Sequence, residues 1–219
     1  MLPREQAIMW HQPYREGIAC IRATYIEHTF PRHTHDYFAI GVIEEGFQQF
    51  LLGKHFYRTP PGGMFIINPG EVHTGESATR QGFAYRTIYP SLPMFEAISR
   101  EIIGQARPFP LFTTPVIDDP ELVYLFLSIH RTLELSLSTL EAELCLHQLL
   151  AQVIIRQAPT HPAPRSVGCE RREVARVRAY LDEHICENST LQQLADYARL
   201  SPFYLNRVFR KEVGMPPYA

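Results

Sequence analysis

The stretch of residues 190–214, TLQQLADYARLSPFYLNRVFRKEVG, contains the signals of two short helices joined by a tight turn. Thr190 can cap the first helix, and Gln193 three residues later completes a capping box. Ser201-Pro202 is a restart signal, because serine caps a helix and proline suits its first position. Gly214 is placed to end the second helix. Apolar residues recur at helical spacing in both halves: Leu191, Leu194, Ala195 and Ala198, then Leu205, Val208 and Phe209. The stretch therefore predicts a helix-turn-helix.

The second of these helices carries a contrasting face opposite its apolar one. That face holds Phe203, Asn206, Arg207 and Arg210, which we place in its first two turns. In the major groove of DNA asparagine can pair with adenine and arginine with guanine, and an aromatic ring there can meet a thymine methyl or a sugar. We therefore expect these four residues to bind DNA. The alternative is a solvated helix face with one stray aromatic residue.

Together these residues resemble the AraC/XylS family of transcription regulators, whose first helix-turn-helix has the pattern LxxLA…LSxxyLxRxFkxxxG. The resemblance implies that Phe203, Asn206 and Arg207 touch DNA. In that family a long helix joins two helix-turn-helix units, and this chain stops at 216–219, where the joining helix would begin. We therefore expect residues 170–219 to be a partial AraC-type DNA-binding domain, which binds DNA weakly without a second unit.

Upstream, residues 18–90 read as short strands separated by turns such as Pro60-Pro61-Gly62-Gly63. Strands of this length and spacing predict a sandwich or a barrel. His33 and His35, two positions apart, point to one face of a strand, and His73 follows the Pro69-Gly70 turn. Three imidazoles can hold a divalent metal with coordination positions left open.

This histidine pattern resembles the cupin barrel, whose motifs are HxH with a following acid and then PxGxxH. Ala39 and Ile40 stand where the acid is expected. The cupin-like sensory domains of AraC/XylS regulators retain such histidines without catalysis. Three readings of His33, His35 and His73 follow: an effector pocket or local hydrogen bonding, a metal site that is structural or sensing, and a metalloenzyme. We favour the first, and the missing acid disfavours the last.

Strand alternation adds Tyr25, Arg86 and Tyr89 to the candidate effector pocket. A guanidinium inside a barrel needs a partner, which an effector carboxylate or phosphate would supply. The alternative for Arg86 is an internal ion pair or an outward position. Residues 82–90 resemble a subgroup of these regulators often encoded beside amino-acid exporters, which favours an amino acid or related metabolite as the effector.

Between the two motifs, residues 120–157 have helical periodicity. Leu140, Leu144 and Ile154 widen the apolar stripe of the second helix beyond one buried face. Either this helix is wedged between the barrel and a neighbouring helix, or it meets a second subunit in a homodimer. The prolines that follow predict an exposed linker. We therefore divide the chain into a cupin-like effector-binding and dimerisation domain (1–157), a linker (158–169) and the helix-turn-helix segment (170–219), an α+β protein.

Composition agrees with a regulator in the cytoplasm. The 219 residues are 45% hydrophobic and 20% charged, with no apolar run long enough for a membrane helix and no secretion signal. The net charge is −2, so DNA contact must come from a local basic patch. The four cysteines, at 20, 145, 169 and 186, lack CxxC spacing and predict reduced thiols. We expect a ligand-responsive, sequence-specific DNA-binding regulator with operator DNA and a small effector as partners. The alternative is a cupin metal-binding protein or metalloenzyme.

Overall fold

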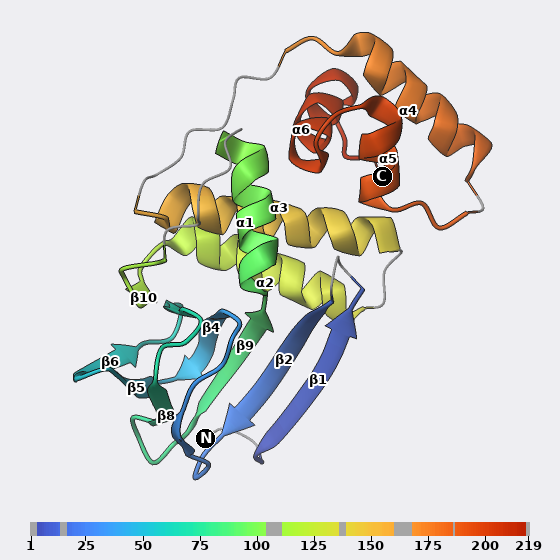
Figure 1. The fold of residues 1–219 in the computed structure, drawn as a ribbon. Helices are drawn as coiled ribbons and strands as arrows, with labels where there is room; N and C mark the ends of the chain where they lie inside the picture. The colour runs from blue at the N-terminus through green and yellow to red at the C-terminus, as the bar shows by residue number, and fades with distance from the viewer. Residues whose placement is uncertain are drawn as a thin grey trace.

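A computed structural model describes residues 4–13, 17–103, 111–135, 139–159, 168–185 and 187–217. Figure 1 shows β-sheets at one end of the molecule, a layer of helices beside them, and a second group of helices beyond that layer. Among the described residues, no helix is both long and apolar enough to cross a membrane. The expected order of a β-rich domain, helices and a helix-turn-helix is confirmed.

The strands form two sheets rather than one continuous barrel. The larger sheet has the order β1-β2-β9-β4-β7-β10, with β1 (Gln6–Gln12), β2 (Ile18–Tyr25), β9 (Phe83–Tyr89), β4 (Ala39–Gly46), β7 (Met64–Ile67) and β10 (Val116–Ile117). The smaller has the order β3-β8-β5-β6, with β3 (Phe30–His33), β8 (His73–Ser77), β5 (Gln48–Leu52) and β6 (His55–Thr59). Every pairing is antiparallel, which suits the short turns read from the sequence.

Gly46 allows the chain to pass from one sheet to the other, between β4 and β5. Its φ of +72° lies in the left-handed region, and an added Cβ would meet the carbonyl oxygen of Gly82. Only glycine satisfies both conditions without strain. The turn between β4 and β5 therefore requires glycine at this position.

The larger sheet has a different core on each face. Towards the smaller sheet, Phe83, Tyr85 and Phe65 pack with Phe50. Towards the helices, alternate residues such as Ile88 join a second core. Because neighbouring residues on a strand point to opposite faces, this alternation decides which side chains can reach the space between the sheets.

Three helices cover the outer face of the larger sheet: α1 (Leu92–Ile103), α2 (Pro120–Glu134) and α3 (Thr139–Gln157). Helix α3 is apolar on most sides because it has two cores to fill. Ile154 packs with the sheet and helices of the first domain, whereas Leu140 and Leu144 pack with the helix-turn-helix segment. All three are buried inside one chain. The wide apolar stripe of α3 therefore does not mark a dimer surface. The prediction that these residues meet a second subunit is wrong, and the alternative of a helix wedged within the chain holds.

The C-terminal segment contains α4 (Arg171–Glu183), α5 (Leu191–Ala198) and α6 (Pro202–Val213). The predicted caps are confirmed: Thr190 and Gln193 form a capping box on α5, and Ser201 accepts a hydrogen bond from the Tyr204 N–H on α6. Gly214 ends α6 with a φ of +85°. Helices α5 and α6 pack together as a helix-turn-helix, with α4 across them.

The expected linker of residues 158–169 falls largely on 160–167, outside the described residues. At its start Ala158 is buried, and at its end the Gly168 N–H donates to the Tyr204 hydroxyl at 2.8 Å. The described ends of this segment are therefore held against the two domains. Cys20 and Cys145 are buried, Cys169 is an exposed free thiol, and Cys186 lies outside the described residues.

Candidate functional site

The three predicted histidines come together between the sheets. His33 ends β3 and faces His73, the first residue of β8, in the strand register, and His35 follows two residues after His33. The ring centroids of His33 and His73 are 4.3 Å apart, and those of His35 and His73 are 4.9 Å apart. One nitrogen from each ring lies within 4.8 Å of the others. The expected convergence of the trio is confirmed.

Backbone carbonyls fix the tautomer of all three rings. Nδ1 of His33 lies 2.8 Å from the Pro31 oxygen, and Nδ1 of His35 lies 2.7 Å from the Tyr37 oxygen. Nδ1 of His73 lies 2.9 Å from the oxygen of Glu71. Each Nδ1–H therefore donates to a carbonyl, which leaves each Nε2 as the nitrogen with a lone pair. This is the outer-shell arrangement that histidine metal ligands usually have.

Burial keeps His35 and His73 in the neutral form, which binds a metal or accepts a hydrogen bond. It lowers the pKa of His35, and it lowers the pKa of His73 to about 4, because the charged imidazolium is poorly solvated there. Both rings are neutral near pH 7. Among the described residues, no carboxylate joins the three histidines in this cluster, and the sequence likewise lacks the acid of the cupin motif.

The trio lines a small cavity of about 180 Å³. Its other walls are aromatic and apolar, with one amide: Phe30, Tyr37, Ala39, Gln48, Phe65, Ile67, Thr74, Gly75, Tyr85 and Tyr89. Oε1 of Gln48 is buried and has no hydrogen-bond partner among the described residues. Burial raises the pKa of Tyr85 and Tyr89, so both hydroxyls stay protonated. The cavity thus offers neutral donors and acceptors to a small ligand.

The sequence predicted Tyr25 and Tyr89 for this pocket, and Tyr89 does line the cavity. It did not predict Gln48, Tyr37 or Tyr85, which line the cavity as well. Tyr25 lies behind the wall, hydrogen-bonded to Tyr85, and its ring packs edge-on against Phe30 at 5.3 Å. Gln48 follows the Gly46 turn by two residues. Its only sequence signal is its place at the start of a strand of the smaller sheet.

Arg86 corrects the prediction of an effector contact. It lies on the helix-facing side of β9, opposite to Tyr85 and Tyr89. Its Nε donates to Glu44 at 3.0 Å, and its Nη1 donates to Glu134 on α2 at 2.8 Å. The alternative reading, an internal ion pair, is the one that the structure contains. No arginine or lysine lines the histidine cavity among the described residues.

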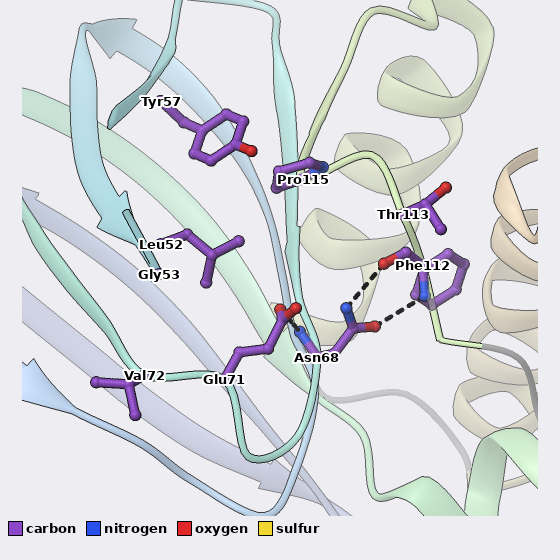
Figure 2. A pocket seen from close by; sticks show the side chains of 9 residues that line it. All are labelled: Leu52, Gly53, Tyr57, Asn68, Glu71, Val72, Phe112, Thr113 and Pro115. Atoms are coloured by element: carbon purple, nitrogen blue, oxygen red, sulfur yellow. Dashed lines mark hydrogen bonds between the residues drawn. The ribbon is translucent and has the colours of Figure 1, made fainter. Parts of the chain in front are cut away.

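A second hollow, of about 470 Å³, lies near the turn between β5 and β6 (Figure 2). Two of its polar side chains are already engaged with the backbone. The carboxamide of Asn68 donates to and accepts from the backbone of Phe112, both at 2.9 Å. Glu71 accepts from the N–H of Asn68 at 2.9 Å. Figure 2 shows these groups turned towards one another, so they hold the loops together rather than face the hollow.

The predicted DNA-binding face on α6 is only partly open. Phe203 is 8% exposed and its ring stacks on His147 of α3 at 6.0 Å between centroids. Asn206 is also 8% exposed. Arg207 is half-buried, with its guanidinium 5.3 Å from the centre of the Phe203 ring, and Arg210 is exposed beside Gln148. Phe203 and Asn206, two of the four residues predicted to bind DNA, are therefore covered in this structure, where α1 and α3 pack against α6.

Comparison with known proteins identifies both parts of the chain. Residues 16–150 match the AraC-like ligand binding domain, and residues 181–217 match bacterial regulatory helix-turn-helix proteins of the AraC family. The uncharacterized HTH-type transcriptional regulator YbfI of Bacillus subtilis (strain 168) is 31% identical over 189 residues, covering 86% of this chain and 68% of that protein.

Solved structures similar to this chain match part of it at low identity. A conserved protein of unknown function from Streptococcus pyogenes, SPY1581, has a TM-score of 0.35 and 15% identity over 42% of this chain and 79% of its own. An oxalate decarboxylase from Bacillus subtilis has a TM-score of 0.31 and 10% identity over 34% and 21%. The family matches, with the cupin-like β-rich domain and the helix-turn-helix, lead to one conclusion: the chain belongs to the AraC family of ligand-responsive, DNA-binding transcription regulators.

Proposed function

We propose that the histidine cavity is the effector site of this regulator, and that His33, His35 and His73 hold a divalent metal there. The observation that carries this proposal is the common tautomer: three Nδ1–H groups donate to backbone carbonyls, which leaves three Nε2 atoms for one ligand. Zn–N bonds of about 2.0–2.1 Å would bring ligand nitrogens to roughly 3.4 Å from one another. The observed separation, within 4.8 Å, requires a modest closure of the side chains.

The residues that line the histidine cavity limit the chemical classes of effector that it can bind. A carboxylate effector, such as the amino acid favoured by the sequence resemblance, finds no arginine or lysine among the described lining residues. A metal on the trio would supply the missing positive charge. Gln48 and the hydroxyls of Tyr85 and Tyr89 would then orient the effector by hydrogen bonds. We propose a small oxygen-donor ligand, bound in a cavity of about 180 Å³.

We also propose that the chain acts in the cytoplasm by binding operator DNA rather than by catalysis. Support comes from its helix-turn-helix and from its membership of a family of regulators. On α6, Asn206 and Arg207 would read bases and Arg210 would contact phosphate. Phe203 would contact DNA only after it leaves the core of the first domain, to which it belongs in this structure.

Calorimetric titration with Zn²⁺ tests the metal site. The parent chain should bind one equivalent. His73→Ala should weaken binding by more than the roughly 10–100-fold that loss of an outer-shell partner costs, because it removes a ligand itself. His55→Ala, which removes an exposed histidine on β6, is the matched control and should bind like the parent. Equal affinities of His73→Ala and His55→Ala would show that the metal binds elsewhere.

The effector class is tested by thermal shift with the free amino acids and small carboxylates, measured with and without Zn²⁺. Stabilisation that appears only with the metal supports a metal-linked effector. Stabilisation that is independent of Zn²⁺ and survives in His73→Ala would favour an effector held by hydrogen bonds alone.

A further inference from the structure

The helix-turn-helix is held against the first domain by an exchange of side chains. Phe203, from α6, is part of the core that the helices share with the larger sheet. In return Leu140 and Leu144, from α3, are part of the core of the helix-turn-helix. Figure 1 shows α5 and α6 above α3, with α6 beside the upper end of α1. This contact places two acidic side chains of the first domain at the ends of the two DNA-binding helices.

Glu101, in the last turn of α1, lies at the N-terminus of α6. Its Oε2 accepts a hydrogen bond from the backbone N–H of Phe203 at 3.1 Å and lies 3.1 Å from Nε2 of His147. The first N–H groups of a helix have no partner within the helix and carry partial positive charge. A carboxylate from another domain therefore satisfies an amide at the start of the recognition helix.

Glu143, in α3, does the same for the first helix of the pair. Its Oε2 accepts a hydrogen bond from the N–H of Leu191, the first residue of α5, at 2.5 Å. The Glu143 side chain is buried in this contact. Two carboxylates on neighbouring helices of the ligand-binding domain thus occupy the N-termini of both helices of the helix-turn-helix.

These are the groups with which a helix-turn-helix contacts DNA. Backbone N–H groups at helix N-termini bind phosphate oxygens, and the N-terminal residues of the second helix enter the major groove. Asn206 on the same helix is buried, and its Oδ1 has no hydrogen-bond partner among the described residues. An asparagine able to pair with adenine is therefore covered and unsatisfied in this arrangement.

We propose that Glu101 and Glu143 form an intramolecular latch that mimics two DNA phosphates and excludes DNA from the helix-turn-helix. The latch and DNA compete for the N–H groups of Leu191 and Phe203. In the latched state α1 and α3 cover Phe203 and Asn206, so the chain must open before α6 enters the major groove. This inference rests on the proposed DNA binding of α6.

Helix α1 connects the latch to the histidine cavity. At its N-terminus Ser91 forms a β-bridge with Tyr37, which lines the cavity, and its hydroxyl accepts from the Met94 N–H at 3.3 Å. At its other end lies Glu101. A ligand that moves Tyr37 therefore acts on the helix that carries half of the latch, which gives the effector a direct route to DNA binding.

The test compares three full-length chains: the parent, the double variant Glu101→Ala/Glu143→Ala, and the control Glu96→Ala/Glu121→Ala. The control removes the same charge from α1 and α2 without touching the latch. Affinity for a labelled random-sequence DNA duplex is measured at low salt by fluorescence anisotropy. The latch variant should bind roughly tenfold tighter than the control or better, within the usual range of coupling between sites.

Hydrogen exchange on the same proteins separates the possible outcomes. Peptides from α5 and α6 should exchange faster in the latch variant than in the control. Equal duplex affinities of the latch variant and the control overturn the latch and leave DNA binding intact. If none of the three proteins binds the duplex while exchange is still faster in the latch variant, the proposed DNA binding is wrong. The proposal that the latch excludes DNA then fails with it.

A measurement on the parent chain keeps the proposal testable if the latch variant does not fold. Saturating duplex should speed exchange in α1 and in the N-terminal half of α3, because DNA takes the helix-turn-helix away from that surface. Bound duplex with unchanged exchange in both segments would overturn the latch.

Discussion

Buried ionisable side chains lie on the helix-facing side of the larger sheet, and His130 on α2 is fully enclosed there. Its Nδ1 lies 3.1 Å from Nη1 of Arg86, and its Nε2 lies 3.2 Å from the carbonyl oxygen of Thr87. The ring therefore accepts from Arg86 and donates to Thr87 as a neutral imidazole. A second proton would face the guanidinium. Burial, reinforced by Arg86, lowers the pKa of His130 to about 4.

This site predicts a pH-dependent stability. An unfolded histidine titrates near pH 6.5, so below that pH the unfolded chain binds the proton more readily than the folded one. The contribution of His130 is complete above about pH 6.5 and falls as the pH drops towards 4, by on the order of 3 kcal/mol in total. In urea unfolding between pH 7 and 4, the free energy of unfolding should fall less steeply with decreasing pH for His130→Gln than for the parent. His55→Gln should keep the parent slope, and an unchanged slope in His130→Gln would contradict the assignment.

Arg207 and Arg210 should differ in their effect on DNA binding. On an operator selected from random duplexes, Arg207→Ala should cost about 1–3 kcal/mol and relax preference at one base pair. Arg210→Ala should weaken all sequences alike and reduce the slope of log affinity against log salt by about one. Anisotropy titrations at several salt concentrations measure both. The same loss for both variants on every sequence would contradict base reading by Arg207.

At the scale of elements, ion pairs join the larger sheet to α2. Glu44 on β4 accepts from Arg86 on β9 at 3.0 Å and from Arg131 on α2 at 2.8 Å. The two arginines differ in burial: the Arg86 side chain is 7% exposed and that of Arg131 is 59% exposed. Arg86 also pairs with Glu134 of α2. The Glu44 carboxylate thus has one buried partner, Arg86, and one solvated partner, Arg131.

This pair of arginines offers a matched stability test. Arg86→Ala should lower the free energy of unfolding by about 3–5 kcal/mol, because it leaves the buried Nδ1 of His130 without a donor and leaves Glu44 and Glu134 only their more exposed partners, Arg131 and Arg22. Arg131→Ala should cost no more than about 1 kcal/mol, since an exposed ion pair is weak. Chemical denaturation at neutral pH measures both values. Losses of similar size would show that Arg86 does not anchor α2 to the sheet.

For the whole molecule, α3 is the element shared by both cores. Its N-terminal half belongs to the helix-turn-helix core through Leu140 and Leu144, and its C-terminal half belongs to the core of the first domain. The two domains are therefore coupled by packing as well as by Glu101 and Glu143. The homodimer stays a prediction, and it needs a surface other than these leucines.

Leu144→Asn should loosen the helix-turn-helix without changing the mass of the assembly, because Leu144 is buried within the chain. Hydrogen exchange in α5 and α6 should rise, while sedimentation velocity should give the same mass as the parent. Tyr124→Asn, on the exposed face of α2, is the complementary variant, since Tyr124 is free to meet a second chain. If Leu144→Asn alone converts a dimer to a monomer, then Leu144 does lie in the dimer interface.

The local chemistry of this protein was readable in its sequence. Thr190, Gln193, Ser201 and Gly214 set the ends of the helices because a cap depends on residues within one turn. The convergence of the three histidines followed from two short motifs on strands of one fold. Each of these inferences needed only neighbours in the chain or a known strand arrangement, so the sequence alone determined the family, the order of the domains and the histidine site.

Tertiary structure decided which surfaces are covered. The alternation of side chains along a strand shows that Arg86 and Tyr85 face opposite sides of the sheet. It does not show which side contains the histidine cavity. Likewise, the spacing on α6 separates Phe203 and Asn206 from its apolar stripe, yet they are buried because α1 and α3 lie on that face. Burial depends on contacts between segments distant in sequence, and no local pattern records them. The structure alone therefore showed that Glu101 and Glu143 lie at the N-termini of α6 and α5.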